Sequence, residues 1–205
     1  EDNHLLDNPH IFLDEIMRQA QESEIIRLSM AIRQGLPIKE VRGNEVIVLS
    51  NSELNTGMLQ WADQILCATN AKRIDINSQM RGLLGKVGEP QDGDKVICTR
   101  NYWDIYADNE DPLINGTIGT LKNSFNSCNY IPKYMGGGKI DTLITDFVAD
   151  NGSYFNKLEA DRTMFSTGEP TLDWKTSFKL SKNPKTRHLI PLEFDYGYCI
   201  TGWKA

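Results

Sequence analysis

The stretch QILCATNAKRIDINSQMRGLLG, residues 64–85, decides the fold class. Its first six residues are almost wholly apolar, which is typical of a strand covered on both faces. Ile74, Ile76 and Met80 then indicate a helix, and Gly82 or Gly85 is expected to end it. A buried strand that runs directly into a helix predicts an α/β layer with parallel strands.

Upstream of this stretch the pattern is mostly helical. Residues 11–34 predict two helices, with Ser23 as the N-cap of the second and Gly35 just after its end. The run EVIVLS at 45–50 predicts a short strand, and residues 54–62 predict a brief helix. Helices alternating with short apolar strands agree with the α/β assignment.

Downstream the sequence pattern changes at residues 88–94, where Gly, Pro and Asp cluster and indicate a boundary. Turn signals at Asn115-Gly116 and at Asp150-Asn151-Gly152 lie between apolar runs and predict hairpins. Several short strands with tight turns predict a small β-barrel.

Three segments follow from these patterns. Residues 1–92 form the first part of an α/β domain, residues 93–190 form an inserted β-barrel, and residues 191–205 form a return strand of the α/β domain. The two ends of an inserted domain are expected to lie next to each other on the parent sheet.

Composition narrows the classes of function. The chain has 205 residues, 40% of them hydrophobic, and a net charge of −6, which argues against a protein covered in nucleic-acid-binding surface. One local run carries cations and no acid, and it either follows a phosphate backbone or is a solvated loop. Its members are Lys175, Lys179, Lys182, Lys185 and Arg187.

Cysteines and hydropathy predict the setting. The four cysteines form no C-x-x-C pair, so a zinc site is not expected, and a reducing, cytoplasmic setting is the simpler interpretation. No stretch of 18 apolar residues exists, so no membrane partner is expected. The three histidines are scattered and predict no metal site.

Several segments, taken together and in order, resemble one family. They are IFLDEIMRQAQESEIIRLSMAIRQG (11–35), ADQILCATNAKRIDINSQMR (62–81), GDKVICTRN (93–101), INGTIGTL (114–121) and FDYGYCITGWKA (194–205). The chain is similar to the C-terminal half of superfamily 1 DNA helicases of the RecD/Dda type, with a UvrD-type C-terminal domain, which occur in bacteria and phages. The resemblance implies a partial RecA-like parallel-sheet domain of the P-loop NTPase type, interrupted by an SH3-like β-barrel.

The family's last strand runs into a loop of the form T-x-H-K-[SA]-Q-G. Thr201, Lys204 and Ala205 match that loop, whereas Trp203 stands where histidine is usual. The chain is therefore expected to be a fragment cut inside a motif. In the family this loop contacts the DNA backbone, so Thr201 and Lys204 are expected to bind phosphates.

The resemblance also implies a catalytic arginine. Arg18 matches the family's arginine that reaches the γ-phosphate across the cleft between two motor domains, with Gln19 beside it. An arginine fork there stabilises the charge that builds on the phosphate oxygens. Without the family pattern, Arg18 is a surface residue of an amphipathic helix.

The remaining candidate residues are expected to bind nucleic acid. Asn70 lies where a buried strand becomes a helix, a place where an amide and a helix start can meet a phosphate, and Arg73 follows one turn later. The resemblance implies that this segment faces single-stranded DNA. Asn70 is equally well explained as a simple helix cap. In the β-rich segment, Arg100 and Trp103 are expected to be exposed, and a ring there can stack on a base. Tyr102 is expected to be exposed beside them.

The sequence contains no G-x-x-x-x-G-K-[ST] loop to cradle phosphates, so this chain alone is not expected to hydrolyse ATP. The expected function is that of part of an ATP-dependent 5′-to-3′ DNA helicase. ATP and Mg²⁺ are then cofactors of the full-length protein, with none expected on this fragment. The expected partners are single-stranded DNA and an N-terminal motor domain.

Two alternatives remain open at this stage. The same segments suit the motor subunit of an ATP-dependent exonuclease complex, with exonuclease subunits as partners. They also suit a non-catalytic module whose β-barrel binds nucleic acid or protein.

Overall fold

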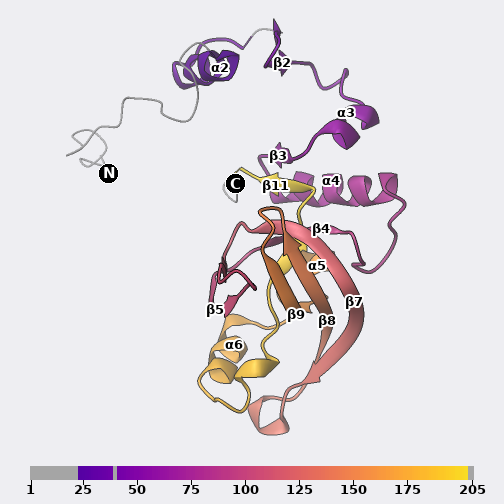
Figure 1. The fold of residues 1–205 in the computed structure, drawn as a ribbon, viewed down its shortest axis with the longest axis vertical. Coiled ribbons are helices and arrows are strands. Elements are labelled where there is room, and N and C mark those ends of the chain that lie inside the picture. The colour runs from indigo at the N-terminus through magenta and orange to yellow at the C-terminus, as the bar shows by residue number, and fades with distance from the viewer. Residues whose placement is uncertain (1–22, 39–40, 203–205) are drawn as a thin grey trace, which may run out of the picture. The chain divides into compact units, whose positions relative to one another are not determined.

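A computed structural model describes residues 23–38 and 41–202. The chain forms two compact units, Glu1–Asn55 and Thr56–Ala205. It is a mixed α/β structure with a two-stranded parallel sheet and a larger antiparallel sheet, both within the second unit. Figure 1 shows the ribbon.

The first unit holds one described helix and a small hairpin. Helix α2 (Glu24–Arg33) begins as predicted, because the Ser23 hydroxyl accepts a hydrogen bond from the Ile25 amide. Strands β1 (Val41–Arg42) and β2 (Ile47–Val48) pair in antiparallel fashion. The Glu24 carboxylate accepts from the amides at 45 and 46, which joins the helix to the hairpin and lowers the pKa of that carboxyl. The helix predicted within 11–20 lies outside the described residues.

The second unit begins with the strand–helix stretch that decided the fold class. Helix α3 (Thr56–Trp61) leads to β3 (Ile65–Cys67), and α4 (Asn70–Leu83) follows and ends near Gly82 as predicted. The last strand, β11 (Cys199–Thr201), returns to pair with β3 in parallel, with Ile200 opposite Leu66. Helix α4 packs against both strands.

The prediction that β3 is covered on both faces is wrong for the described residues. Leu66 leaves 59% of its surface exposed, because α4 covers only one side of the β3–β11 pair. An apolar run alone does not distinguish one covered face from two.

Four strands of the larger sheet lie in the predicted β-rich segment, 93–190, whereas the fifth, at 194–196, lies in the segment that was predicted to return to the α/β domain. The strands of this sheet, in spatial order, are β10 (Phe194–Tyr196), β4 (Lys95–Cys98), β7 (Ile118–Tyr130), β8 (Lys139–Ala149) and β9 (Tyr154–Asp161). Its first and last strands in the sequence pair in antiparallel fashion, with Phe194 opposite Cys98, so the segment's two ends lie side by side as an insert requires.

The described strands do not form the closed barrel that the sequence predicted. The two edges of the sheet meet at one isolated bridge, between Ala160 of β9 and Leu192, two residues before β10. No continuous ladder joins β9 to β10 among the described residues.

One of the two predicted hairpins is wrong and the other is confirmed. Around Asn115-Gly116 a turn does form, because the Thr117 amide donates to the Ile114 carbonyl at 3.1 Å. The strands that flank the turn do not pair, however: β6 (Pro112–Leu113) pairs with β5 (Tyr102–Tyr106), whereas β7 pairs with β4 and β8. The turn at 150–152 joins β8 and β9 as a hairpin.

Two β-bulges bend this sheet, and one carboxylate holds both. The registers shift between Lys122 and Phe125 on β7 and opposite 145–147 on β9. Asn123 and Lys157 have positive φ angles at these places, of 52° and 48°. Asp146, on the strand between them, accepts from the Asn123 side chain at 2.6 Å and from the Lys157 amide at 2.9 Å.

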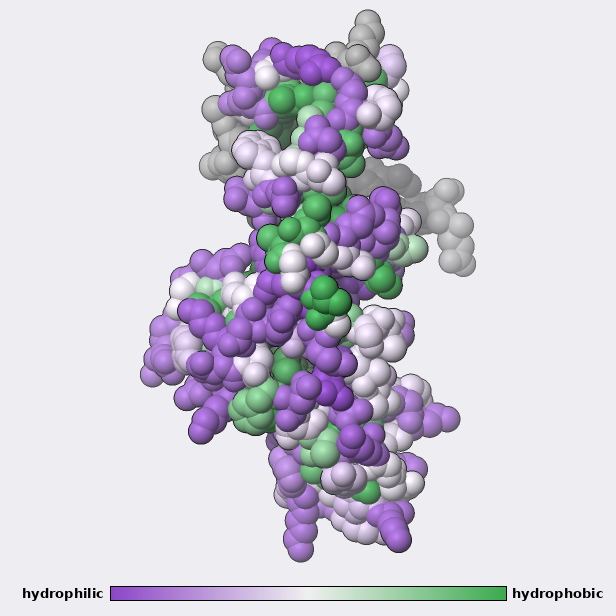
Figure 2. All heavy atoms as spheres, turned by 90° about the vertical axis from the view of Figure 1, so that its right-hand side faces the viewer, coloured by the Kyte–Doolittle hydropathy of each residue, from purple (hydrophilic) through white to green (hydrophobic). Residues whose placement is uncertain are grey.

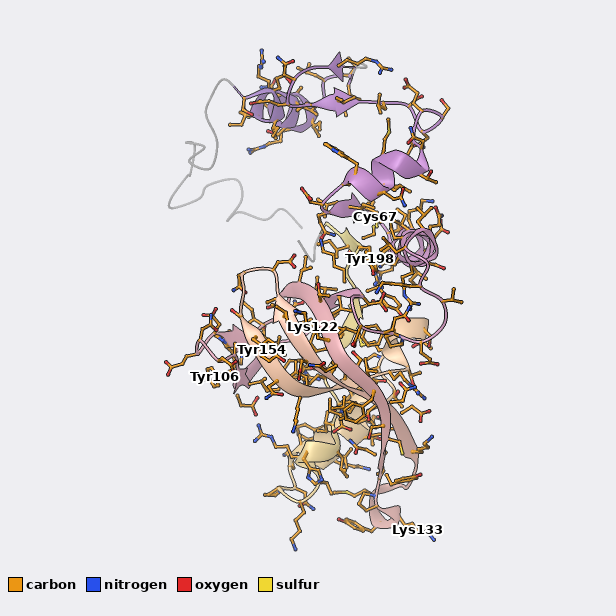
Figure 3. All side chains as sticks on the ribbon, turned by 45° about the vertical axis from the view of Figure 1, so that its right-hand side comes forward. Cys67, Tyr106, Lys122, Lys133, Tyr154 and Tyr198 are labelled. Atoms are coloured by element: carbon orange, nitrogen blue, oxygen red, sulfur yellow. The ribbon has the colours of Figure 1, made fainter. Side chains whose placement is uncertain are left out.

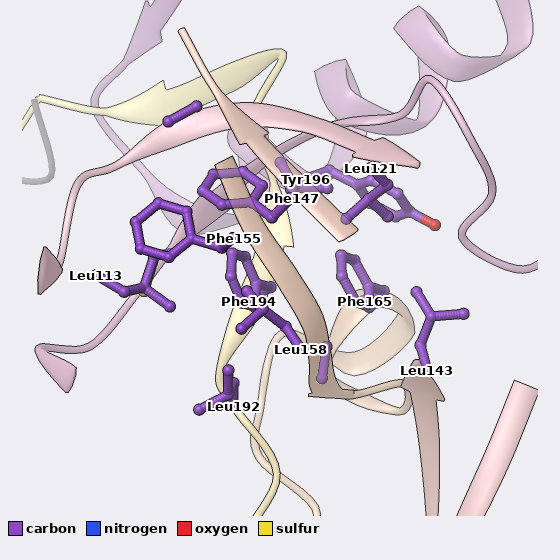
Figure 4. Close-up of a cluster of buried hydrophobic side chains, with 14 of the residues drawn as sticks. Leu113, Leu121, Leu143, Phe147, Phe155, Leu158, Phe165, Leu192, Phe194 and Tyr196 are labelled. Carbon is purple, nitrogen blue, oxygen red and sulfur yellow. The ribbon is translucent and has the colours of Figure 1, made fainter. Parts of the chain in front are cut away.

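A cluster of aromatic and aliphatic side chains fills the inside of the curled sheet (Figure 4). The Phe147 ring lies 5.1 Å from that of Phe194 and 5.8 Å from that of Phe155, each fully buried. Each such side chain contributes about 1.5–3 kcal/mol by leaving water. Only glycine fits at position 119, because a Cβ there would lie 2.2 Å from the Val148 carbonyl oxygen and 2.8 Å from the Phe147 ring.

Three short helical segments complete the unit: α5 (Met164–Thr167), α6 (Trp174–Ser181) and the 3₁₀ turn η2 (Arg187–Leu189). A further 3₁₀ turn, η1 (Lys133–Met135), lies between β7 and β8. The space-filling view shows hydrophilic side chains predominating on the face of this unit, with apolar patches between them (Figure 2).

Candidate nucleic-acid interface

The carboxyl ends of β3 and β11 lie together because the two strands run parallel. Cys67 ends β3 opposite Thr201, which ends β11, and the Gly202 amide donates to the Cys67 carbonyl at 3.2 Å. Helix α4 begins three residues after β3. In open α/β sheets ligands bind at this edge, where strand ends and a helix N-terminus meet. We call these residues, 67–72 with 201–202, the carboxyl edge.

The start of α4 is formed by a threonine and not by the asparagine that the sequence suggested. Thr69 is the N-cap, and its hydroxyl accepts from the Lys72 amide at 3.3 Å. Asn70 is the first helical residue and is exposed, so its interpretation as the helix cap is wrong. The side-chain amide of Asn70 is therefore accessible to a ligand at the carboxyl edge, and its contact with DNA stays a prediction.

Lys72 adds a cation at the carboxyl edge that the sequence interpretation overlooked. Its ammonium donates to Asp75 at 2.9 Å, and this hydrogen bond raises the pKa of the lysine. The i,i+3 spacing of the two side chains was visible in the sequence and is the signal that would have identified the pair.

Thr201 is buried and its hydroxyl has no hydrogen-bond partner among the described residues. Beneath it, the Cys67 thiol donates to the carbonyls of Thr69 and Ile200, at 3.4 and 3.7 Å. Burial raises the pKa of the neighbouring Cys199 thiol to about 12, so this thiol stays protonated at neutral pH.

Arg73 does not face solvent, which corrects its expected position. Its side chain is 4% exposed and forms an ion pair with Asp195, the middle residue of β10. Helix periodicity turns Arg73 toward the sheet, since Ile76 and Met80 on the same face are also buried. As described, the guanidinium joins α4 to the antiparallel sheet and is not displayed to DNA.

A second set of buried polar contacts strengthens this junction. The Asn77 amide donates to the carbonyls of Tyr196 and Cys199, each at 3.0 Å, and its oxygen accepts from the Cys199 amide at 2.7 Å. Arg81 pairs with the fully buried Asp94, which also accepts from the Tyr198 hydroxyl at 3.0 Å. The contacts of Asn77 could not be predicted from the sequence, because its partners lie 119 and 122 positions away along the chain.

The candidates on the β-rich segment are partly as expected. Trp103 is 65% exposed, and Arg100 lies at the surface in an ion pair with Glu193 at 2.9 Å. Tyr102 is half-buried, and its hydroxyl accepts from the Glu193 amide at 2.7 Å, so its expected exposure is wrong. Burial raises the pKa of that hydroxyl.

Arg18, Gln19 and Lys204 lie outside the described residues, so the predicted arginine finger and part of the expected phosphate-binding loop have no described position. Asn70, Lys72 and Thr201 come together at the carboxyl edge. Trp103 belongs to β5 and Arg100 lies two residues before that strand, so neither is part of the carboxyl edge.

Two hollows lie near this junction. One, of about 600 Å³, lies between α4, the loop 86–90 and α5, and it is lined by the cations Arg81, Lys86 and Arg162. The other, of about 700 Å³, borders Leu66 and Ile200 together with the turns at 114–118 and 149–151. Figure 3 shows the side chains of this region around Cys67 and Tyr198.

Within the described ranges, no cluster of three or more His, Cys, Asp or Glu side chains is arranged to hold a metal ion. No helix in those ranges is both long and apolar enough to cross a bilayer. No family model matches the chain, and the curated proteins contain no match to it.

Proposed function

We propose that residues 56–202 belong to the second motor lobe of an ATP-dependent DNA helicase that moves 5′ to 3′ on single-stranded DNA. In this proposal β3, α4 and β11 are part of a RecA-like sheet, and the antiparallel sheet is an SH3-like insert. Asn70 and Lys72, both exposed, hold the DNA backbone at the carboxyl edge, beside the end of β11.

One observation carries the proposal. Two strands more than 130 positions apart, β3 and β11, are parallel neighbours under α4, while the chain between them leaves and returns through adjacent strands β4 and β10. An interrupted motor lobe requires this organisation, and the carboxyl ends of its parallel strands are where such folds bind ligands.

The chemistry at this edge suits phosphates. The exposed side-chain amide of Asn70 and the exposed ammonium of Lys72 suit position-fixing contacts to a backbone without reading bases, whereas the Thr201 hydroxyl at the same edge is buried. ATP and Mg²⁺ enter the proposal only through Arg18 and Gln19, which suit stabilisation of a γ-phosphate held by a phosphate-binding loop on another domain.

The test is a charge placed at the helix start. Asn70→Asp favours α4, because an anion at a helix N-terminus is stabilising, yet it repels phosphates. We expect the Asn70→Asp substitution to weaken binding of a fluorescent oligo-dT of about fifteen nucleotides to the 205-residue chain at least fivefold, with no loss of thermal stability. Fluorescence anisotropy measures the binding.

Asn126→Asp, an exposed position on β7, makes the same change of charge and serves as the control that leaves binding intact. Equal affinity of Asn70→Asp and the wild type would remove the carboxyl edge from the DNA path.

A further inference from the structure

The outer face of α6 displays two aromatic rings. Trp174 is 74% exposed and Phe178 is 53% exposed, although the two lie one turn apart and Leu180 is the helix's buried residue. The Lys175 ammonium lies 5.8 Å from the centre of the Trp174 ring, and that of Lys182 lies 4.4 Å from the centre of the Phe178 ring. Each ring is thus bordered by a cation.

The charged side chains that follow Trp174 along the chain, as far as Leu192, are all basic, and the Asp173 carboxylate just before it caps the helix. From Trp174 to Leu192 the chain contains lysines, one arginine and no acid, in a protein of net charge −6. Arg187 is ion-paired with Asp104. None of the four lysines, Lys175, Lys179, Lys182 and Lys185, forms an ion pair within the described part of the chain.

The tip of the β7–β8 hairpin extends this surface. The turn η1 packs against α6 and contributes Lys133 and the 74% exposed Tyr134. Figure 3 shows Lys133 at the end of that hairpin. We call Lys133, Tyr134, Trp174, Lys175, Phe178, Lys179, Lys182 and Lys185 the basic–aromatic surface.

Neither folding nor stability of α6 explains the rings at these positions. The helix is capped by Asp173, whose carboxylate accepts from the amides at 175 and 176, and it is anchored by Leu180. Leaving large apolar rings in water forgoes the gain that burial would bring. Flat rings set among unpaired ammonium groups are the groups that bind single-stranded nucleic acids, since bases stack on the rings while phosphates meet the cations.

We propose that the basic–aromatic surface binds a single-stranded nucleic acid. A duplex keeps its bases stacked on one another and offers these rings only its backbone, so the surface favours the unpaired strand. The proposal goes beyond the proposed function and does not rest on it, because no residue of the carboxyl edge belongs to this surface.

The experiment measures binding of the same fluorescent oligo-dT to the 205-residue chain over a series of salt concentrations. Trp174→Ala/Phe178→Ala is expected to weaken binding at least fivefold, since each stacked base contributes a factor of that size or more. Lys179→Glu/Lys182→Glu is expected to weaken binding and to reduce the slope of log K against log salt by about 1.4, about 0.7 for each lost phosphate contact.

Matched controls lie elsewhere on the same unit. Tyr106→Ala removes a ring that is 60% exposed on β5, and Lys122→Glu reverses an exposed charge near the start of β7. Both are expected to leave affinity and slope unchanged. Because all four altered α6 side chains are exposed, the thermal unfolding midpoint of each α6 variant is expected to match the wild type.

The outcomes separate this inference from the proposed function. Wild-type affinity in both α6 variants overturns the inference, and so does tighter binding of a duplex than of oligo-dT. If the α6 variants lose binding while Asn70→Asp does not, the inference stands and the carboxyl edge falls. The reverse pattern overturns the inference alone.

Discussion

At the scale of single residues, Arg73 shows what a linear sequence conceals. Its position after a strand end predicts a cation displayed to a ligand, yet it is buried against Asp195, 122 positions away. Helix periodicity places Arg73 on the covered face, but only the fold brings β10 beneath it. The sequence could not show whether Thr69 or Asn70 caps α4, because either residue type can cap a helix. The choice depends on which residue is the last one before helical geometry begins, and that residue is Thr69.

Breaking the Arg73–Asp195 pair is expected to cost more than its attraction suggests. Arg73→Met leaves the Asp195 carboxylate buried without its cation, and we expect the free energy of unfolding to fall by about 3–5 kcal/mol. Chemical denaturation of the chain measures this loss.

A second change tests the cause of that loss. Arg73→Met/Asp195→Asn removes the uncompensated charge and is expected to recover much of the stability. Lys72→Met breaks the exposed pair with Asp75 and is expected to cost less than about 1 kcal/mol. Equal losses for the buried and the exposed pair would contradict this account.

At the scale of elements, periodicity and turn chemistry predicted the described helices of the first 92 residues and one hairpin, but not the helix at 174–181, which holds part of the lysine run. The helices at 24–33 and 70–83 and the hairpin at 150–152 were predictable because each rests on contacts within a few residues. The turn at Asn115-Gly116 was also correct as a turn. Its strands pair with β4, β5 and β8 instead of with each other, and local signals carry no information about such partners.

The two bulges of the antiparallel sheet depend on Asp146. The Lys157 amide, then the Tyr154 hydroxyl and the Asn123 side chain, hold the pKa of this carboxyl below its ordinary value. A carboxyl with a lowered pKa in the folded state stabilises it above the unfolded value, about 3.9, and this contribution is lost as the pH falls through the folded value.

Asp146→Asn is therefore expected to be less stable than the wild type at pH 7, with a gap that narrows below about pH 4. Urea denaturation at pH 7 and at several values below 4 measures the gap. Tyr154→Phe removes one of the three donors and keeps the carboxylate, so a smaller gap of the same sign is expected. A gap independent of pH would show that the carboxylate's charge plays no part.

At the scale of the whole chain, the order of segments was the informative signal. An α/β beginning, a β-rich middle and an apolar return strand predicted that the last strand would rejoin the first layer, and β11 pairs with β3. Whether the middle segment closes as a barrel depends on the pairing of β9 with β10. That pairing is reduced to the bridge at Ala160, and no pattern of turns predicts it.

The proposed motor requires residues from more than one domain, which gives a prediction at this scale. If the proposed helicase assignment holds, Arg18→Ala in the full-length protein is expected to abolish DNA-stimulated ATP hydrolysis and to leave the affinity for single-stranded DNA close to that of the wild type, since it removes only charge stabilisation at the γ-phosphate. Phosphate release measures turnover. Arg33→Ala, an exposed arginine at the end of α2, is the control, and turnover unaffected by Arg18→Ala would refute the assignment.

The pairing of β4 with β10 has a consequence for how such a chain changes over evolutionary time. The chain enters the antiparallel sheet at β4 and leaves it at β10, and these two strands are hydrogen-bonded to each other, with Tyr196 opposite Val96. A change in the length of the segment between β4 and β10 is compatible with the pairing of β3 and β11 as long as β4 and β10 stay paired. Any altered segment has to keep β10 in place, because Asn77 bonds to the Tyr196 carbonyl and Arg73 is paired with Asp195 on that strand.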